Sequence, residues 1–252
     1  LTRAILGTMS YRPIHDYAVI GDMNSAALVS LDGSIDWACF PRFDSPSVFG
    51  AILDHTKGGR FAISPVGPFT STQRYRPETT ILETTFTTDD GAVTVIDFMA
   101  NASVHRAEAP HEIVRIVRGD LGAVRMRAEF QPRLDYARGL TSLSADPRGI
   151  TAHHGVDTLS LLTSLPFSIE TAADGGQRAA AEFDVAVGQS IDMVAVYGGA
   201  PPWPITPEDI QDRVERAEEL ARQIVAGLKY GGHWRDQVIR SVLTLHMLTY
   251  DP

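Results

Sequence analysis

A chain of 252 residues with 44% hydrophobic and 21% charged residues has a globular composition and is long enough to bury a sizeable core. Its formal net charge of -9, with the 22 lysines and arginines scattered, argues against a nucleic-acid partner, which would need a concentrated basic surface. The sequence has no run of about 18 apolar residues, so it predicts no membrane-spanning helix and no membrane partner.

Cysteine usage and the N-terminus bear on the cellular compartment. The single cysteine, Cys39, cannot form an intrachain disulfide, and its apolar neighbours indicate a small buried side chain rather than a reactive thiol. The first residues, LTRAILGTMSYRP, are too short and too polar for a secretory signal. Leu1 in place of methionine suggests that the chain was trimmed or that its start was misassigned, with Met9 as the alternative beginning. We therefore expect a cytoplasmic protein.

Strand and turn signals alternate from about residue 17 to residue 197. Hairpins are predicted at Asp32-Gly33 in AALVSLDGSIDWACF and at Asp90-Gly91 in LETTFTTDDGAVTVIDFM, because these residue types tolerate the positive φ of tight turns. A third turn is predicted at residues 119–122, in HEIVRIVRGDLGAVRMRAEFQP. Further strands are predicted in GITAHHG (149–155), DTLSLLTSL (157–165), FSIETAA (167–173), QRAAAEFDVAVG (177–188) and SIDMVAVYGG (190–199). Many short strands at this spacing predict a mainly β, antiparallel sandwich or barrel.

The pattern changes to helix near the C-terminal end. Thr206, Pro207 and Asp209 have the residue types and spacing of a helix cap with a capping box. The helix that follows should bury the apolar stripe Ile210, Val214, Leu220, Ile224 and Leu228 and end at Gly231-Gly232.

The second predicted helix, HWRDQVIRSVLTLHMLTY (233–250), is apolar over a wide arc. Its apolar positions are Val238, Val242, Leu245 and Leu248, widened by Ile239, Leu243 and Met247. Such a helix is typically buried against other helices, and none follows before Pro252. We therefore expect the chain to be a fragment that ends on the first helix of a helical domain.

Several segments carry a resemblance to a known family. They are DYAVIGDMNSAALVSLDGSIDWACFPRFDSPSVFGAILD, GGRFAISPVG, RYRPETTILETTFTTDDGAVTVIDFM and PRLDYARG. The chain from Ile14 onward resembles the N-terminal domain of bacterial glycoside hydrolase family 15 proteins, which include trehalases, glucoamylases and glucodextranases. The resemblance implies a β-supersandwich (residues 1–204), then a helical linker and the first helix of an (α/α)6 barrel (205–252).

The same resemblance limits the function of the chain. It implies inverting hydrolysis of an α-glucosidic bond by two glutamates of the barrel, one as acid and one as base. Neither position lies in this sequence, so we expect no catalytic residue, no cofactor and no metal site here. The implied partners are the C-terminal barrel of the same polypeptide and, in the full-length enzyme, an α-glucoside substrate; the bare last helix makes a homo-oligomer possible.

The segment DGSIDWACFPRFDSPS (32–47) holds the candidate residues for a substrate rim or a domain interface, which are Trp37, Phe40, Arg42 and Asp44. Strand alternation places Ile35, Trp37 and Cys39 on one face and Phe40 on the other. Pro41 should then end the strand, so that the next residues form a loop. A guanidinium can donate to two sugar hydroxyls and an aromatic ring can stack on a sugar, so the loop is interpreted either as an interface clamp or as part of the pocket lining.

A second segment, QPRLDYARG (131–139), repeats the Pro-Arg-x-Asp pattern of residues 41–44. It is either a second rim loop or, as we favour, a strand end with a buried salt bridge. Two other functions stay open for the whole chain. One is an autonomous carbohydrate-binding sandwich with Trp37, Trp203 or Trp234 as stacking platforms, and the other is a purely structural or oligomerising domain.

Overall fold

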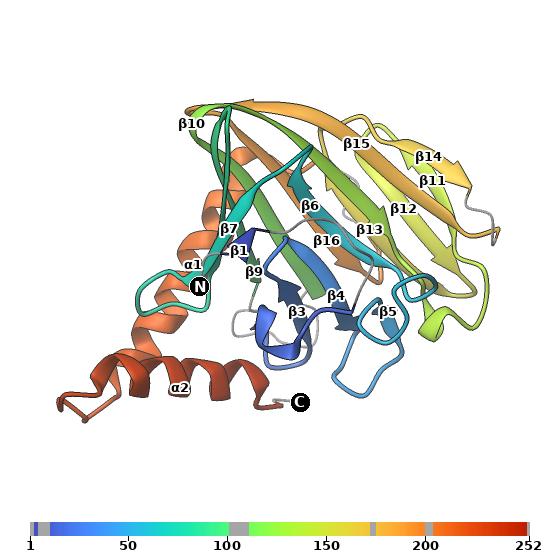
Figure 1. The fold of residues 1–252 in the computed structure, drawn as a ribbon. Helices are drawn as coiled ribbons and strands as arrows, with labels where there is room; N and C mark the ends of the chain where they lie inside the picture. Colours follow the sequence, from blue (N-terminus) through green and yellow to red (C-terminus); the bar gives the residue numbers. More distant parts are fainter. Residues whose placement is uncertain (1–2, 5–10, 101–110, 172–174, 200–203, 251–252) are drawn as a thin grey trace.

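The computed structural model describes residues 3–4, 11–100, 111–171, 175–199 and 204–250. It is mainly antiparallel β-structure followed by two helices, as the sequence predicts (Figure 1). The strands are β1 (Arg3–Ala4), β2 (Tyr17–Gly21), β3 (Ala26–Ser30), β4 (Ser34–Cys39), β5 (Ser47–Phe49), β6 (Arg60–Pro65), β7 (Thr70–Tyr75), β8 (Leu82–Thr88), β9 (Gly91–Met99), β10 (His111–Gln131), β11 (Ser142–Asp146), β12 (Gly149–His154), β13 (Asp157–Thr163), β14 (Ser168–Thr171), β15 (Gln177–Ala186) and β16 (Ser190–Tyr197).

Two antiparallel sheets share the long strand β10. In the first sheet the strand order is β1-β7-β8-β9-β10-β16-β13-β12-β11. In the second sheet β2, β3, β4 and β6 lead to the other half of β10, which continues to β15 and β14, while β5 pairs with the end of β4. The two sheets pack face to face, which is the supersandwich that the resemblance implied.

The turn predicted at residues 119–122 is wrong, because β10 continues through it to Gln131. A bulge between Gly119 and Leu121 shifts the register there; before it β10 pairs with β16, and after it with β15. The glycine at 122 serves close packing instead: it has φ +64°, and a Cβ on it would lie 2.2 Å from the Asp90 carbonyl oxygen of the β8–β9 turn.

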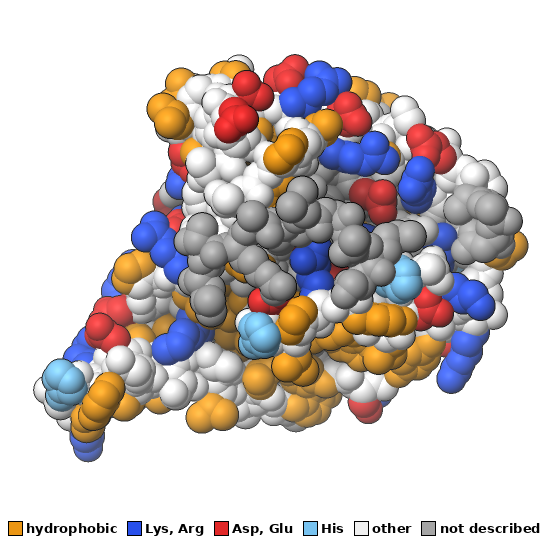
Figure 2. Space-filling view, viewed as in Figure 1, with side chains coloured by type: hydrophobic (Ala, Val, Ile, Leu, Met, Phe, Trp, Pro, Cys, Tyr) orange, Lys and Arg blue, Asp and Glu red, His pale blue; other side chains and the backbone are white. Residues whose placement is uncertain are grey.

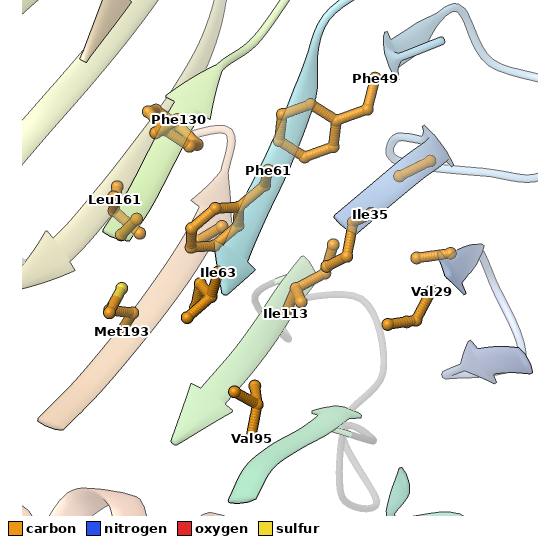
Figure 3. Packing of buried hydrophobic residues seen from close by; sticks show 14 of the residues in the cluster. Val29, Ile35, Phe49, Phe61, Ile63, Val95, Ile113, Phe130, Leu161 and Met193 are labelled. Carbon is orange, nitrogen blue, oxygen red and sulfur yellow. The ribbon is translucent and has the colours of Figure 1, made fainter. Parts of the chain in front are cut away.

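The main hydrophobic core lies between the two sheets. Phe49, Phe61 and Phe130 come from three strands of the second sheet, and their ring centroids lie between 5.4 and 6.4 Å apart. Aliphatic side chains of the first sheet, such as Val95 and Ile113, belong to the same cluster (Figure 3). Removing side chains of this size from water contributes about 1.5–3 kcal/mol each.

The predicted hairpin at Asp32-Gly33 is confirmed and is tied to the first sheet by a buried arginine. Arg115 of β10 donates from Nε to Asp97 Oδ1 at 2.8 Å, and Asp97 lies directly opposite it on β9. Its two terminal nitrogens donate to the carbonyl oxygens of Gly33 and Phe61, both in the second sheet region. One guanidinium therefore joins the two sheets at the turn.

Helix α1 (Pro207–Ala226) covers the outer face of the first sheet (Figure 1). The predicted capping box of Thr206 and Asp209 is present. The buried positions differ in part from the predicted stripe: they are Ile210, Ala217, Ala221 and Val225. The helix ends before Gly227 rather than at residues 231–232; Ala217 packs with the first sheet and Ala221 with α2.

Helix α2 (Arg235–Leu248) packs against α1 and against the sandwich. Ile239 and Leu243 join the apolar contact with α1, and the Met247 carbonyl oxygen accepts from the Met23 N–H at 3.1 Å. An ion pair between Arg235 and Glu78, 2.6 Å long, also joins α2 to the β7–β8 turn. Both helices are thus docked on the strands, and the division between 1–204 and 205–252 as domains stays a prediction.

Candidate functional site

The loop between β4 and β5 carries the charged candidates, Arg42 and Asp44. Arg42 Nε donates to Asp44 Oδ1 at 3.1 Å, and the two side chains are 56% and 77% exposed. Ser45 gives the loop its shape, because its N–H donates to the Arg42 carbonyl oxygen and its Oγ accepts from the Arg42 N–H. The loop therefore presents a guanidinium and a carboxylate to solvent from a compact backbone turn.

Phe40 lies beneath this loop and is 1% exposed. Its ring stacks on that of Tyr197 at the end of β16, with centroids 5.8 Å apart. Burial, followed by the Asp157 carboxylate that accepts from the Tyr197 hydroxyl at 2.7 Å, raises the pKa of Tyr197 above its usual range. Phe40 thus supports the loop from the core side, while Arg42 and Asp44 occupy the surface.

The predicted facing of β4 is wrong beyond Ile35. The register pairs Val29 with Ile35 but Leu28 with Trp37, so Asp36 is an extra residue in a β-bulge. The bulge changes the alternation, so that Ile35 and Ala38 both belong to the main core while Trp37 is only partly buried. When side chains are assigned to alternating faces of a strand, one extra residue in a bulge places every later side chain on the opposite face from the one predicted.

Cys39 behaves as a structural residue. It is the last residue of β4 and is buried, and burial raises the pKa of its thiol to about 11. At neutral pH the sulfur stays protonated, which removes the nucleophilic form.

Two carboxylates of the same hairpin serve the fold. Asp36 accepts from the Tyr17 hydroxyl at 2.7 Å and from Ser34 Oγ at 2.5 Å. Asp32 pairs with Arg12, and burial, opposed in part by that guanidinium, raises the pKa of Asp32. Because these carboxylate oxygens are used by neighbouring hydroxyl and guanidinium groups, we interpret both residues as supports of the hairpin.

The segment 131–139 lies beside the Arg42 loop. The Arg133 N–H donates to the Val48 carbonyl oxygen at 2.8 Å. The Tyr136 hydroxyl donates to the Ser45 carbonyl oxygen at 3.2 Å. Arg138 places its guanidinium 5.1 Å from the centroid of the Tyr136 ring. We call residues 40–46 and 132–140 the paired loops. Tyr136 and Arg138 were missed as candidates, and the repeated Pro-Arg-x-Asp pattern was the only signal in the sequence that linked the two segments.

The segment is a strand end, as favoured, but the salt bridge between Asp135 and Arg138 is exposed rather than buried. It begins at the end of β10, and Arg133 is buried and donates to the Gln177 carbonyl oxygen at 2.8 Å. Asp135 pairs with Arg138 at 3.5 Å on the exposed side. A strand end held by a buried arginine thus also forms a surface loop.

The β2–β3 turn joins the end of α2 to the end of β4. In this turn Met23 donates to Met247 of α2, as described above, and Ser25 Oγ donates to the Cys39 carbonyl oxygen at the end of β4. In Figure 1 the ends of α2 and β4 lie on the same, lower side of the molecule. The paired loops and the end of α2 therefore share one side of the domain.

The outward face of α2 is apolar near its C-terminal end. Leu245 is 66% exposed, and Leu248 and Tyr250 are also exposed, whereas the exposed residues earlier in the helix, Asp236, Gln237 and Ser241, are polar. Trp234 is exposed too, but it lies at the N-cap, at the other end of the helix. In Figure 2 hydrophobic side chains on the lower side of the molecule gather toward the C-terminal end of α2 and the neighbouring region that Figure 1 labels β3 to β5, and the rest of α2 has a mixed surface. The predicted positions Val238 and Val242 are partly buried, because α2 turns its Ile239 side toward α1. An apolar face of this kind is typical of an interaction surface.

Other sites are less informative. A cavity of about 410 Å³ lies between β13, β16 and the start of α1, lined by Leu162, Asp192 and Pro207 among others, and it shares no lining residue with the paired loops. Within the described ranges, no group of three or more His, Cys, Asp or Glu side chains could hold a metal ion. Trp203, one candidate stacking platform, lies outside the described residues. Among the helices that the structure describes, none is long and apolar enough to span a bilayer.

Comparison with known proteins gives a consistent result. A family model described as "Trehalase-like, N-terminal" matches residues 2–219. The trehalase of Mycobacterium tuberculosis is 34% identical over an alignment 266 positions long, gaps included, which covers 96% of this chain and 38% of the relative. The trehalase of Mycolicibacterium smegmatis is also 34% identical, with 96% and 39% covered, and that of Thermoplasma volcanium is 26% identical, with 96% and 38% covered. The chain thus spans less than two fifths of the length of these curated relatives.

Proposed function

This chain belongs to the family of trehalase-like N-terminal domains, and we propose that it supports and partly lines the active site of a catalytic (α/α)6 barrel carried by the rest of its polypeptide. The proposal rests on one observation: the paired loops and the C-terminal end of α2 lie on the same side of the domain. In a polypeptide as long as the relatives, the residues that follow α2 would begin on the same side of the domain as Arg42 and Asp44.

The barrel and this chain have different roles in the proposed enzyme. The acid and base glutamates that the family resemblance implies belong to the barrel, and this chain supplies neither. Its own contribution is to hold the barrel on the apolar face of α2 and to place polar groups at the edge of the pocket. The substrate is an α-glucoside of the trehalose or maltose type.

Arg42 and Asp44 are suited to contact sugar hydroxyls. An arginine fork can donate to two neighbouring oxygens, and a carboxylate can accept from a third hydroxyl. Their mutual ion pair is exposed, so exchanging it for substrate contacts costs at most about 1 kcal/mol. Trp37, which is partly exposed on β4, is the aromatic candidate for the same edge or for the domain interface.

Phe40 has an indirect part in this proposal. Its ring packs below the loop, and its contact with the Tyr197 ring holds the start of the loop against the core. We propose no cofactor, no metal and a cytoplasmic location for the protein, and a homo-oligomer stays a prediction.

The test compares residues 1–252 with the same chain extended by its natural downstream coding sequence. Glucose release from trehalose and from maltose is measured for both proteins, purified from a host that lacks these activities. The extended protein is expected to hydrolyse at least one of the two sugars, and residues 1–252 neither. Hydrolysis by residues 1–252 alone, or a downstream sequence without an active catalytic domain, would contradict the proposal.

A further inference from the structure

The short 3₁₀ segment η3 (Asp135–Ala137) in the second of the paired loops has an unusual backbone. Asp135, Tyr136 and Ala137 have φ values of +51°, +55° and +57°, so three consecutive residues with side chains adopt the left-handed conformation. L-residues avoid this region because Cβ approaches the following carbonyl oxygen, and it is normally visited by single residues. Such strained segments persist only where the surroundings determine them, and they gather at functional sites.

The residues on either side of η3 supply those surroundings. Leu134 is buried, and its N–H donates to Thr141 Oγ1 at 3.1 Å. Arg133 is held on β5 and β15 by the two hydrogen bonds described above, one to the carbonyl oxygen of Val48 and one to that of Gln177. The turn is therefore anchored at its base, and its strain places one large side chain, Tyr136, toward the neighbouring loop.

Tyr136 contacts Ser45, the residue whose hydrogen bonds shape the Arg42 loop. Its hydroxyl donates to the Ser45 carbonyl oxygen at 3.2 Å, while the Ser45 N–H and Oγ both bond to the backbone of Arg42. The two Arg42 bonds are local to the loop, whereas the Tyr136 bond comes from a segment 91 positions away. It fixes the loop relative to the sandwich.

We propose that Tyr136 is a positioning residue for substrate contact by Arg42, acting through the Ser45 carbonyl. This inference rests on the proposed function, because it assigns Tyr136 a role at the same edge of the pocket. The Tyr136 ring is 41% exposed, so its contribution to core packing is limited. Its hydroxyl restricts the positions that the Arg42 guanidinium can reach, and the Arg138 guanidinium over its ring holds the phenol in place.

The test uses the full-length protein with its downstream region, in which Tyr136→Phe removes only the hydroxyl. A single neutral hydrogen bond corresponds to about a fivefold effect, so kcat/KM for the α-glucoside is expected to fall about fivefold. The thermal unfolding midpoint is expected to fall by no more than about 4 °C, which is what the loss of one such hydrogen bond costs in a chain of this size, and by the same amount in the control. The matched control is Tyr11→Phe, because the Tyr11 hydroxyl also donates to a loop carbonyl oxygen, that of Leu53, at 3.2 Å.

A double-mutant cycle separates positioning from general structure. With Arg42→Ala already in place, adding Tyr136→Phe is expected to lower kcat/KM no further, since the contact that it positions is gone. Full additivity of the two substitutions, or equal losses in Tyr136→Phe and Tyr11→Phe, would overturn the inference.

The outcome also distinguishes this inference from the proposed function. If Arg42→Ala lowers kcat/KM while Tyr136→Phe retains wild-type kinetics, the positioning role is wrong and the pocket-edge role of Arg42 stands. If Arg42→Ala itself retains wild-type kinetics, the role of the loop in catalysis fails, and the role of Tyr136 fails with it.

Discussion

Replacing Arg115 by methionine is expected to cost a large part of the stability of the domain. The side chains of Arg115 and Asp97 are both 0% exposed, and the guanidinium also supplies the donors for the carbonyl oxygens of Gly33 and Phe61. Breaking a buried ion pair from one side costs about 3–5 kcal/mol, because the remaining charge loses its partner. The free energy of unfolding of a protein domain is about 5–15 kcal/mol in total, so a loss of this size is readily measured.

The assay is urea unfolding at neutral pH, followed by tryptophan fluorescence and circular dichroism. The matched control is Arg125→Met on the same strand, where Arg125 is exposed and pairs with Glu182 at 3.3 Å. An exposed pair of this type contributes at most about 1 kcal/mol. The double variant Arg115→Met/Asp97→Leu should recover much of the loss, since an apolar pair can replace a buried ion pair. Equal effects of Arg115→Met and Arg125→Met would refute the role assigned to this guanidinium.

Three further outcomes follow from the geometry of the hairpin and of α2. Trp37→Ala is expected to cost about 1–2 kcal/mol in the same unfolding assay, because the ring is only partly buried, whereas Ile35→Ala should cost about 2–5 kcal/mol; the reverse order would mean that the bulge assignment is wrong. Gly33→Ala should cost at least about 2 kcal/mol, because Gly33 has φ +82° and a Cβ would lie 2.2 Å from the Ile63 carbonyl oxygen; an unchanged unfolding midpoint would contradict this close approach. Residues 1–252 should self-associate in sedimentation experiments, and Leu245→Lys/Leu248→Lys should reduce the association; a wild-type chain that stays monomeric at high concentration would show that the apolar face is not adhesive.

The sequence predicted best what depends on local chemistry. The hairpins around Asp32-Gly33 and Asp90-Gly91 and the cap at Thr206 follow from residues that lie close together in the chain, and the structure confirms all three. In the second hairpin the turn lies one residue earlier than predicted, at residues 89–90, because Gly91 already pairs with Thr88. The turn predicted at 119–122 failed because its glycines serve a different purpose. They allow neighbouring chain segments to approach β10, and only the tertiary structure shows this requirement.

Bulges and long-range contacts limited the prediction of the site. One extra residue at Asp36 moved Trp37 away from the core face, and no sequence signal marked that bulge. The sequence singled out Arg42 and Asp44, and the repeated Pro-Arg-x-Asp pattern pointed to residues 131–139. It could not bring Tyr136 to Ser45, because the two lie 91 positions apart and meet only through the pairing of several strands.

The central claim is that the Arg42 loop contributes to the active site of the full-length enzyme, and the most direct test is kcat/KM for α-glucoside hydrolysis in Arg42→Ala and Asp44→Ala. A hydrogen bond to a charged group is worth about 1.5–3 kcal/mol, so kcat/KM should fall roughly tenfold to a hundredfold with an unchanged unfolding midpoint. Both side chains are exposed, so neither substitution opens a cavity. Wild-type kinetics in both variants would contradict the claim and leave the loop as a structural or interface element.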